Sequence, residues 1–215
     1  MENNERAGAG AIVTVFSDYV CPFCYLEEPD LARVREEYGE AVEVDWRAYE
    51  LRPDPISTLD PDGEYLHRVW NASVYPMAKS LGMTLRLPPV QPRSRTALEA
   101  AEYAREEGKF DEMHTALFRA FFEDSKDIGQ EETLLEVGAS VGLDLQKLRA
   151  ALEEGRYTEK VLDDEQLALR LGVGSVPTMF VGVAGEPLQD AEVVTGAQPY
   201  GGRIEAAVER ALSRR

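Results

Sequence analysis

A pair of cysteines separated by two residues, Cys21 and Cys24, constrains this chain more than any other feature of its sequence. The pair directly follows a β-branched and aromatic run, residues 11–18, and apolar residues then recur at helical spacing. We therefore expect a strand, a sharp turn and a helix that begins near Pro22, a residue suited to the first helical turn. Cys21 would lie at the helix N-terminus, where backbone N–H groups and the helix dipole stabilise a thiolate, and Cys24 would lie one turn further along. This geometry predicts a nucleophilic cysteine and a second cysteine that resolves a mixed disulfide held on the first.

Two other interpretations of the pair are weaker. A structural zinc site needs two further ligands, but His67 lies 43 residues beyond Cys24 and His114 a further 47 residues on, without the usual ligand spacing. We therefore predict no metal site, and we interpret both histidines as ordinary helix residues. An inert buried pair would not explain why the cysteines follow a strand and open a helix. Because the chain has no other cysteine, a secreted scaffold held by several disulfides is also excluded.

The charge of the chain argues against a nucleic-acid partner. Its 215 residues include 40 acidic and 23 basic side chains, a net charge of −17, which would repel a polyanion. Residues 102–165 carry 18 acidic and 8 basic residues, and we interpret this excess as solvated helical faces. The first ten residues lack the basic start and apolar run of a signal peptide, and no stretch approaches the roughly 18 apolar residues of a membrane helix. We expect a cytoplasmic location and no membrane partner; the sequence does not indicate the oligomeric state.

The remaining pattern predicts an α/β fold with a helical block in the middle. Residues 42–49 alternate with period two and predict a second strand, parallel to the first because a helix connects them. Three prolines and a glycine in residues 52–63 mark a boundary. From there to about residue 171 the pattern predicts four or five helices, with Asp127 and Asp144 as N-caps. The chain should end in a hairpin, whose strands cover residues 179–183 and 192–195, and in a last helix at residues 202–211.

Three segments resemble one known family. The sequence FSDYVCPFCY (16–25) resembles the active-site segment of DsbA-like thioredoxin-fold proteins, specifically the FrnE-like branch. The sequence GSVPTMFVG (174–182) resembles the cis-proline strand of that family, and TGAQP (195–199) resembles the turn before its final helix. The resemblance implies an α/β thioredoxin-like fold with an all-helical insertion. It divides the chain into a first thioredoxin-like part (11–63), the insertion (64–160) and a second thioredoxin-like part (161–215).

The resemblance also assigns roles to residues outside the pair. It implies a cis Val176–Pro177 bond that faces the dithiol, with the Val176 backbone placed to hydrogen-bond an extended substrate segment. Asp18, three residues before Cys21, could relay the proton of Cys24 or could cap the turn through its backbone contacts. We interpret Glu27 and Glu28 as solvated helix residues.

Together these observations predict a thiol-disulfide oxidoreductase or isomerase-type enzyme that acts on protein or peptide thiols and disulfides through Cys21 and Cys24. No metal or organic cofactor is expected, although glutathione could serve as an external thiol. One alternative is a glutathione-dependent isomerase or transferase, of the 2-hydroxychromene-2-carboxylate isomerase or kappa type, whose members typically have serine in place of the nucleophilic cysteine. Another is a non-catalytic, chaperone-like binding module that uses apolar side chains of the insertion. Its candidate contacts, which we interpret as core residues, are Trp70, Tyr75, Met77 and Met83.

Overall fold

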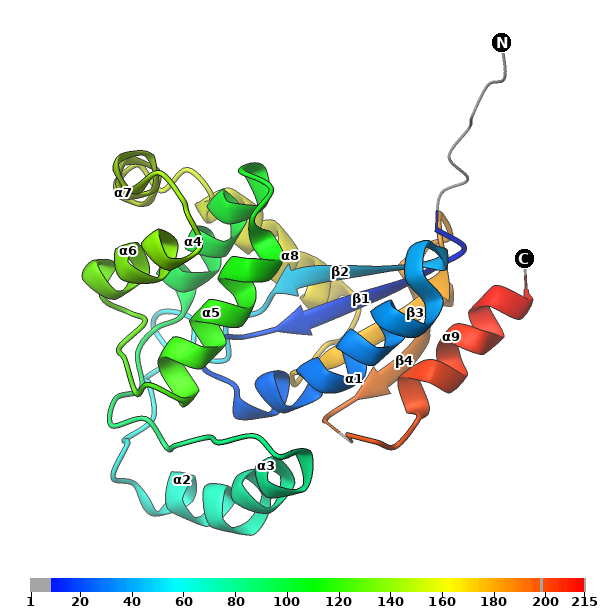
Figure 1. The fold of residues 1–215 in the computed structure, drawn as a ribbon, viewed down its shortest axis with the longest axis horizontal. Helices are drawn as coiled ribbons and strands as arrows, with labels where there is room; N and C mark the ends of the chain where they lie inside the picture. Colours follow the sequence, from blue (N-terminus) through cyan, green and yellow to red (C-terminus); the bar gives the residue numbers. More distant parts are fainter. Residues whose placement is uncertain (1–8, 198, 215) are drawn as a thin grey trace.

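A mixed sheet of four strands, in the order β2-β1-β3-β4, lies at the centre of the computed structural model, which describes residues 9–197 and 199–214 (Figure 1). Strand β1 (Ala11–Ser17) pairs in parallel with β2 (Val42–Ala48), as the connecting helix requires. On its other side β1 pairs antiparallel with β3 (Thr178–Val183), which forms the predicted hairpin with β4 (Glu192–Thr195). All four predicted strands are therefore confirmed.

Two helices cover one face of the sheet. Helix α1 (Pro22–Tyr38) begins with Pro22 and ends at Gly39, where a φ of 52° favours glycine. Helix α9 (Arg203–Ser213) lies beside it, on the side of β3 and β4 (Figure 1). The apolar side chains of this layer form one buried cluster, which includes Val13, Val15, Leu31, Val34, Met179, Val181, Ile204 and Val208. Burial of the side chains of this cluster, which come from two helices and all four strands, holds the layer together.

The helical block contains more helices than the sequence predicted. In the described residues it comprises α2 (Glu64–Val69), a π-helical turn (Trp70–Val74), α3 (Tyr75–Leu81), α4 (Arg95–Glu106), α5 (Phe110–Phe122), α6 (Glu131–Ser140), α7 (Leu145–Glu153) and α8 (Thr158–Arg170). Short turns separate α4 from α5, α6 from α7 and α7 from α8, and each contains a glycine in the left-handed region: Gly108, Gly142 and Gly155. The turns at Gly108 and Gly142 agree with breaks that the sequence predicts, whereas the break at Gly155, between α7 and α8, was not predicted.

Only one of the two predicted N-caps is a cap. The Asp144 side chain accepts hydrogen bonds from the backbone N–H groups of Gln146 and Lys147 at the start of α7. Asp127 is not a cap, because α6 begins four residues later, at Glu131. Its side chain accepts instead from the Gly129 backbone N–H at 2.9 Å, so it shapes the turn before that helix.

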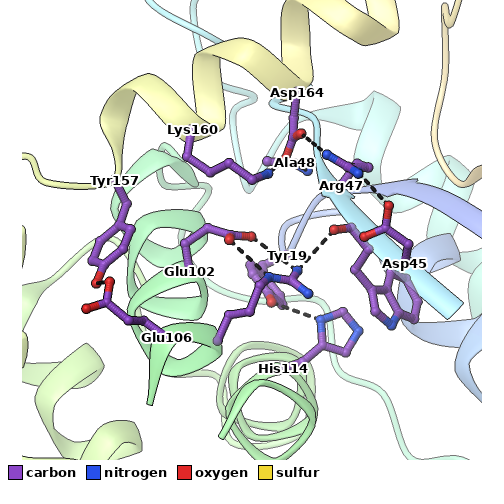
Figure 2. Close-up of polar contacts among 12 residues, drawn as sticks. Tyr19, Asp45, Arg47, Ala48, Glu102, Glu106, His114, Tyr157, Lys160 and Asp164 are labelled. Carbon is purple, nitrogen blue, oxygen red and sulfur yellow. Dashed lines mark hydrogen bonds and ion pairs between the residues drawn. The ribbon is translucent and has the colours of Figure 1, made fainter. Parts of the chain in front are cut away.

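Helix α8 is fixed to β2 by a group of polar contacts (Figure 2). The buried Asp164 carboxylate accepts from the Ala48 backbone N–H at 3.2 Å and from Arg47 at 3.1 Å, and it also pairs with Lys160. A carboxylate with three partners of this kind can be buried at little cost. The predicted boundary at residue 160 falls within α8, and the division into three segments remains a prediction.

A single buried cluster extends from the sheet into the helical block. It joins Phe16 and Phe180 on the strands to Phe118 and Trp70 in the helices. Helices α4 to α7 gather beyond the carboxyl ends of β1 and β2, and α2 and α3 lie to one side of them (Figure 1). The catalytic candidates, which follow β1, are therefore enclosed by the helical block.

The four residues named as candidate contacts of a binding module differ in exposure. Trp70 is buried, as predicted, and Met77 and Met83 are partly buried against the core. Tyr75 is exposed, so its assignment to the core was wrong.

No helix among residues 9–197 and 199–214 is long and apolar enough to cross a membrane. Two predictions fall partly outside these ranges: the absence of a signal peptide concerns residues 1–8, and the turn 195–199 includes Gln198.

Candidate active site

The two cysteine thiols lie where β1 leads into α1. Cys21 is the N-cap residue of α1, its backbone N–H donates to the Asp18 carbonyl at 3.1 Å, and both cysteines are free thiols. Cys24 is fully buried, whereas 3% of the Cys21 surface is exposed. Both cysteines are therefore buried, and Cys21 is the more exposed of the two.

A second segment, 155 residues away along the chain, meets the thiol of Cys21. The Cys21 Sγ donates to the Val176 carbonyl oxygen at 3.5 Å, and the Val176–Pro177 peptide bond is cis. The sequence resemblance placed this segment opposite the dithiol, and the structure brings its backbone there. Val176 and Pro177 immediately precede β3, which pairs with β1, so the strand pairing fixes their position beside the turn.

The environment of Cys24 keeps its thiol protonated. Burial raises the pKa of Cys24 well above its ordinary value, and the neighbouring Cys21 raises it further. The Ser17 hydroxyl and the Asp18 backbone lie next to this thiol and act in the opposite direction, but burial outweighs them. Cys24 therefore needs a proton acceptor before it can attack a disulfide.

Asp18 lies under the same turn and is completely buried. Its carboxylate accepts from the Leu51 backbone N–H at 2.7 Å and from the Val20 backbone N–H at 3.3 Å. Burial raises the pKa of Asp18 to about 6, nearby Glu50 raises it further, and the hydrogen bonds from Leu51, Ser94 and Val20 lower it. These contacts are those of a residue that holds the turn, and the raised pKa is that of a group able to exchange a proton near neutral pH.

Two acidic residues that the sequence analysis did not single out, Glu50 and Glu165, interact with each other, and Glu50 also influences Asp18. Glu50 is buried and pairs with Arg95, and the Glu165 side chain accepts from the Glu50 backbone N–H at 3.4 Å. Burial and the Glu50 carboxyl raise the pKa of Glu165 to about 7, although Arg95 opposes this. Residues 50, 95 and 165 come from a loop and two different helices, so no local pattern could have linked them.

On the other side of the turn, His114 joins two residues near the cysteines. Its Nδ1 lies 2.9 Å from the Tyr19 hydroxyl, and its Nε2 lies 3.0 Å from the Glu28 carboxylate. Because a carboxylate only accepts, Nε2 carries the hydrogen and Nδ1 accepts from Tyr19 when the ring is neutral. Both histidines lie in helices, as predicted: His114 is buried in α5, whereas His67 is exposed on α2.

The two glutamates after Cys24 are also less solvated than predicted. Glu27 is only 2% exposed, and the Glu28 side chain, which contacts His114, is 20% exposed. Glu27 lies three residues after Cys24 and four before Leu31, both buried, so helical spacing already placed it on the inner face. The expectation of a solvated acidic face also fails for Glu102, which is buried and pairs with Arg105.

No group of three or more histidine, cysteine, aspartate or glutamate side chains in the described part of the chain could hold a metal ion. The chemistry that the arrangement itself offers is thiol-disulfide exchange. It provides two sulfurs of unequal exposure, a backbone carbonyl at the more exposed sulfur and titratable groups on both sides of the turn.

Comparison with known proteins agrees with this geometry. Residues 12–202 match the model of the DSBA-like thioredoxin domain. A protein of Bacillus subtilis (strain 168), YwbO, whose function is uncharacterized, is 35% identical over 178 residues, which cover 79% of this chain and 86% of that protein. The match confirms the expected thioredoxin-like fold with its helical content, while the FrnE-like branch remains a prediction.

Two solved structures share the fold. A probable DsbA oxidoreductase from Streptomyces coelicolor is 24% identical, with a TM-score of 0.77 over 95% of this chain and 91% of that one. A 2-hydroxychromene-2-carboxylate isomerase is 20% identical, with a TM-score of 0.73 over 94% of this chain and 95% of that one. At these identities the likeness concerns the fold alone, so the side chains of the site must decide between the two kinds of chemistry.

Proposed function

This chain belongs to the DSBA-like thioredoxin domain family, and from that premise we propose that it catalyses thiol-disulfide exchange on protein or peptide substrates through Cys21 and Cys24. The observation that carries the proposal is the difference between the two thiols. Cys21 lies at a helix N-terminus with 3% of its surface exposed, whereas the fully buried Cys24 has a raised pKa. Such a difference assigns attack on the substrate to Cys21 and resolution to Cys24.

The reaction balances without a further oxidant or reductant. The Cys21 thiolate attacks one sulfur of a substrate disulfide, the substrate S–S bond breaks, and the released substrate thiolate takes up a proton. Cys24 then loses its proton and attacks the Cys21 sulfur of the mixed disulfide. This step forms the Cys21–Cys24 disulfide and releases the second substrate thiol, so the substrate gains the two electrons that the dithiol loses. The reverse sequence oxidises a substrate dithiol.

We assign substrate binding to the backbone beside the dithiol. The Val176 carbonyl lies at the Cys21 sulfur, and an extended substrate segment could pair with Val176 and the residues next to it as a short added strand. In this arrangement Pro177 fixes the backbone opposite the cysteines. Asp18 remains a predicted proton relay for Cys24, in addition to the contacts through which it holds the turn.

The intact cysteine pair favours this function over a glutathione-dependent isomerase or transferase. In the families of that second kind, serine typically occupies the nucleophile position, which is Cys21 in this chain. We propose that no metal or organic cofactor takes part, that an external thiol such as glutathione can return the disulfide to the dithiol, and that the protein works in the cytoplasm.

Matched serine variants of the two cysteines test the proposal. The wild type should reduce the disulfides of insulin in the presence of an external thiol, and Cys21→Ser should abolish the activity. Cys24→Ser should accumulate a mixed disulfide with a peptide disulfide, because the resolving thiol is missing, and Cys21→Ser should accumulate none. Mass spectrometry of the intact protein distinguishes these products.

Two results would contradict the proposal. If the wild type and both variants behave alike towards insulin and all three suppress aggregation of a client protein, the protein is a binding module. If only Cys21→Ser formed an adduct, Cys24 would be the nucleophile and the assigned roles would be wrong.

A further inference from the structure

A small cavity lies between the sheet and the helices α4 and α5, and one of its lining residues, Ser17, is next to the buried thiol of Cys24. Its volume is about 20 Å³, enough for one water molecule. The strands and the turn that follows β1 contribute one wall, and the helices contribute the other. The residues lining it are Ser17, Tyr19, Trp46, Arg47, Ala48, Leu98, Ala101, Glu102, Arg105, Phe110 and His114.

Two buried polar atoms in residues of this lining donate no hydrogen bond to another protein group that meets the usual geometry. They are Ser17 Oγ and Trp46 Nε1, two of the three buried side-chain nitrogen and oxygen atoms without a partner of that geometry among the described residues. Ser17 is 6% exposed and Trp46 is 4% exposed. A buried N–H or O–H without a partner destabilises the fold. Because both residues line one cavity, a single water could satisfy both atoms.

Ser17 connects this cavity to the resolving cysteine. Its hydroxyl lies against the Cys24 thiol and favours the ionised form of that thiol. A hydroxyl can accept a hydrogen bond from the thiol and donate one to a water at the same time. Ser17 is thus the first position to which the Cys24 proton could move.

Tyr19 connects the cavity to a hydrogen-bonded chain that leads outwards. Its hydroxyl donates to His114 Nδ1 (Figure 2), and His114 Nε2 donates to the Glu28 carboxylate, whose side chain is 20% exposed. Burial raises the pKa of Tyr19 well above its ordinary value, so the hydroxyl stays neutral and can pass a proton on. The chain therefore leads from the cavity to a carboxylate in contact with solvent.

The other charged groups at the cavity are already paired. Glu102 pairs with Arg105, and Arg105 also donates to the Trp46 carbonyl oxygen at 3.0 Å (Figure 2). Arg47 pairs with Asp45 and Asp164. These contacts leave Ser17, Tyr19 and the Trp46 N–H as the polar groups of the lining that can bind a water.

We propose that the cavity binds a water that links Ser17 to Tyr19, and that the Cys24 proton leaves through this water and the Tyr19, His114 and Glu28 chain. The proposal rests on the proposed function. Along the path the thiol donates to Ser17, Ser17 to the water, the water to Tyr19, Tyr19 to His114, and His114 to Glu28. Each hydrogen shifts by one position, so Cys24 becomes a thiolate and Glu28 a neutral carboxylic acid. The Trp46 N–H holds the water in place.

The resolution step can be measured alone with an aromatic disulfide whose released thiolate absorbs visible light. When the reduced protein is mixed with this reagent, Cys21 releases one aromatic thiolate and forms a mixed disulfide. Cys24 then releases the second one. Stopped-flow absorbance therefore gives two phases, and the second phase reports the resolution by Cys24.

Three variants break the path at different links: Ser17→Ala, Tyr19→Phe and Trp46→Phe. We expect an unchanged first phase and a second phase slower on the order of 100-fold for Ser17→Ala and Tyr19→Phe. The slowed phase should accelerate in proportion to hydroxide concentration, and its solvent deuterium isotope effect should differ from that of the wild type. Trp46→Phe should give a smaller effect in the same direction, since it removes only the anchor of the water.

Tyr25→Phe is the matched control for Tyr19→Phe. Tyr25 is also buried and also packs against Phe118, and its hydroxyl donates to the Glu123 carboxylate, but it does not line the cavity. Its second phase should equal that of the wild type. A general effect of removing a buried tyrosine hydroxyl would instead slow both variants.

The outcomes separate this proposal from the proposed function. If the wild type gives no second phase, Cys24 does not resolve and the proposed function itself fails. If the wild type gives two phases but folded Ser17→Ala and Tyr19→Phe match it, or if only Asp18→Asn slows the second phase, the path through the cavity is wrong. A crystal structure of the wild type should show a water within hydrogen-bond distance of Ser17 Oγ and Trp46 Nε1. A dry cavity would overturn the proposal even if the variants failed to fold.

Discussion

Replacing Asp18 by asparagine should make the stability of the protein less dependent on pH. Burial raises the pKa of Asp18 from 3.8 to about 6 in the folded protein. One pKa unit corresponds to about 1.4 kcal/mol, so the buried carboxylate costs the fold about 3 kcal/mol when it is fully ionised. Because the folded protein holds this proton more tightly than the unfolded chain, the cost is absent well below pH 3.8. It grows as the pH rises towards 6 and is constant above that value.

The asparagine variant removes the titration and keeps most of the contacts. Its side-chain oxygen can still accept from the Leu51 N–H, the shorter of the two backbone hydrogen bonds of Asp18. For the wild type, the linkage relation gives a cost of about 1 kcal/mol at about pH 4.5 and about 3 kcal/mol at about pH 8. The variant should therefore gain about 2 kcal/mol relative to the wild type between these two pH values.

Urea denaturation of the reduced proteins across this pH range measures the difference in the free energy of unfolding. Asp127→Asn is the control, because Asp127 also accepts from the backbone N–H two residues ahead but is only partly buried. Glu165 titrates in all three proteins, so it largely cancels from the comparison. A difference between wild type and Asp18→Asn that stays constant from about pH 4.5 to about pH 8 would refute the reasoning, because a buried titrating carboxyl must produce a slope.

Two further predictions concern stability and can be checked by the same denaturation assay. Phe118→Ala should lower the free energy of unfolding by about 4 kcal/mol, because this fully buried ring packs against both Tyr19 and Tyr25. A loss below about 1 kcal/mol would contradict this packing. Asp144→Ala should cost about 1 kcal/mol through the two lost N–H contacts at the start of α7, and an unchanged stability would show that the cap contributes nothing.

The parts of the fold that the sequence predicted correctly are set by neighbouring residues. A β-branched run, a proline in the first helical turn and Gly39 after the helix each act within a few residues, so β1 and α1 could be located from the pattern. The dithiol was predictable for the same reason, since its chemistry depends on where the strand ends and the helix begins. Val176 and Pro177 could be assigned only through the family resemblance, because nothing local links them to a residue 155 positions away.

The rest of the site depends on contacts between distant segments. Tyr19 and His114 are 95 residues apart, and a histidine in a helix does not by itself show which residue it will meet. Some signal was nevertheless present. His114 lies four residues after Phe110 and four before Phe118, so it continues an aromatic stripe of α5 that faces the core, and a polar residue in such a stripe needs a partner.

The alternation of side chains explains why titratable groups flank the dithiol on both sides. At the end of β1 and in the turn after it, Ser17 and Tyr19 line the cavity, whereas Asp18, between them, contacts Leu51 and is influenced by Glu50. Consecutive residues thus offer two candidate proton routes to the same buried thiol, and these routes make different predictions. One contains a carboxyl whose pKa is about 6, and the other contains a tyrosine that stays neutral. If Asp18 were the acceptor, the rate of resolution would fall as the pH drops through about 6, and Asp18→Asn would remove that pH dependence. If the cavity route carries the proton, the rate of resolution and its pH dependence are the same in Asp18→Asn as in the wild type.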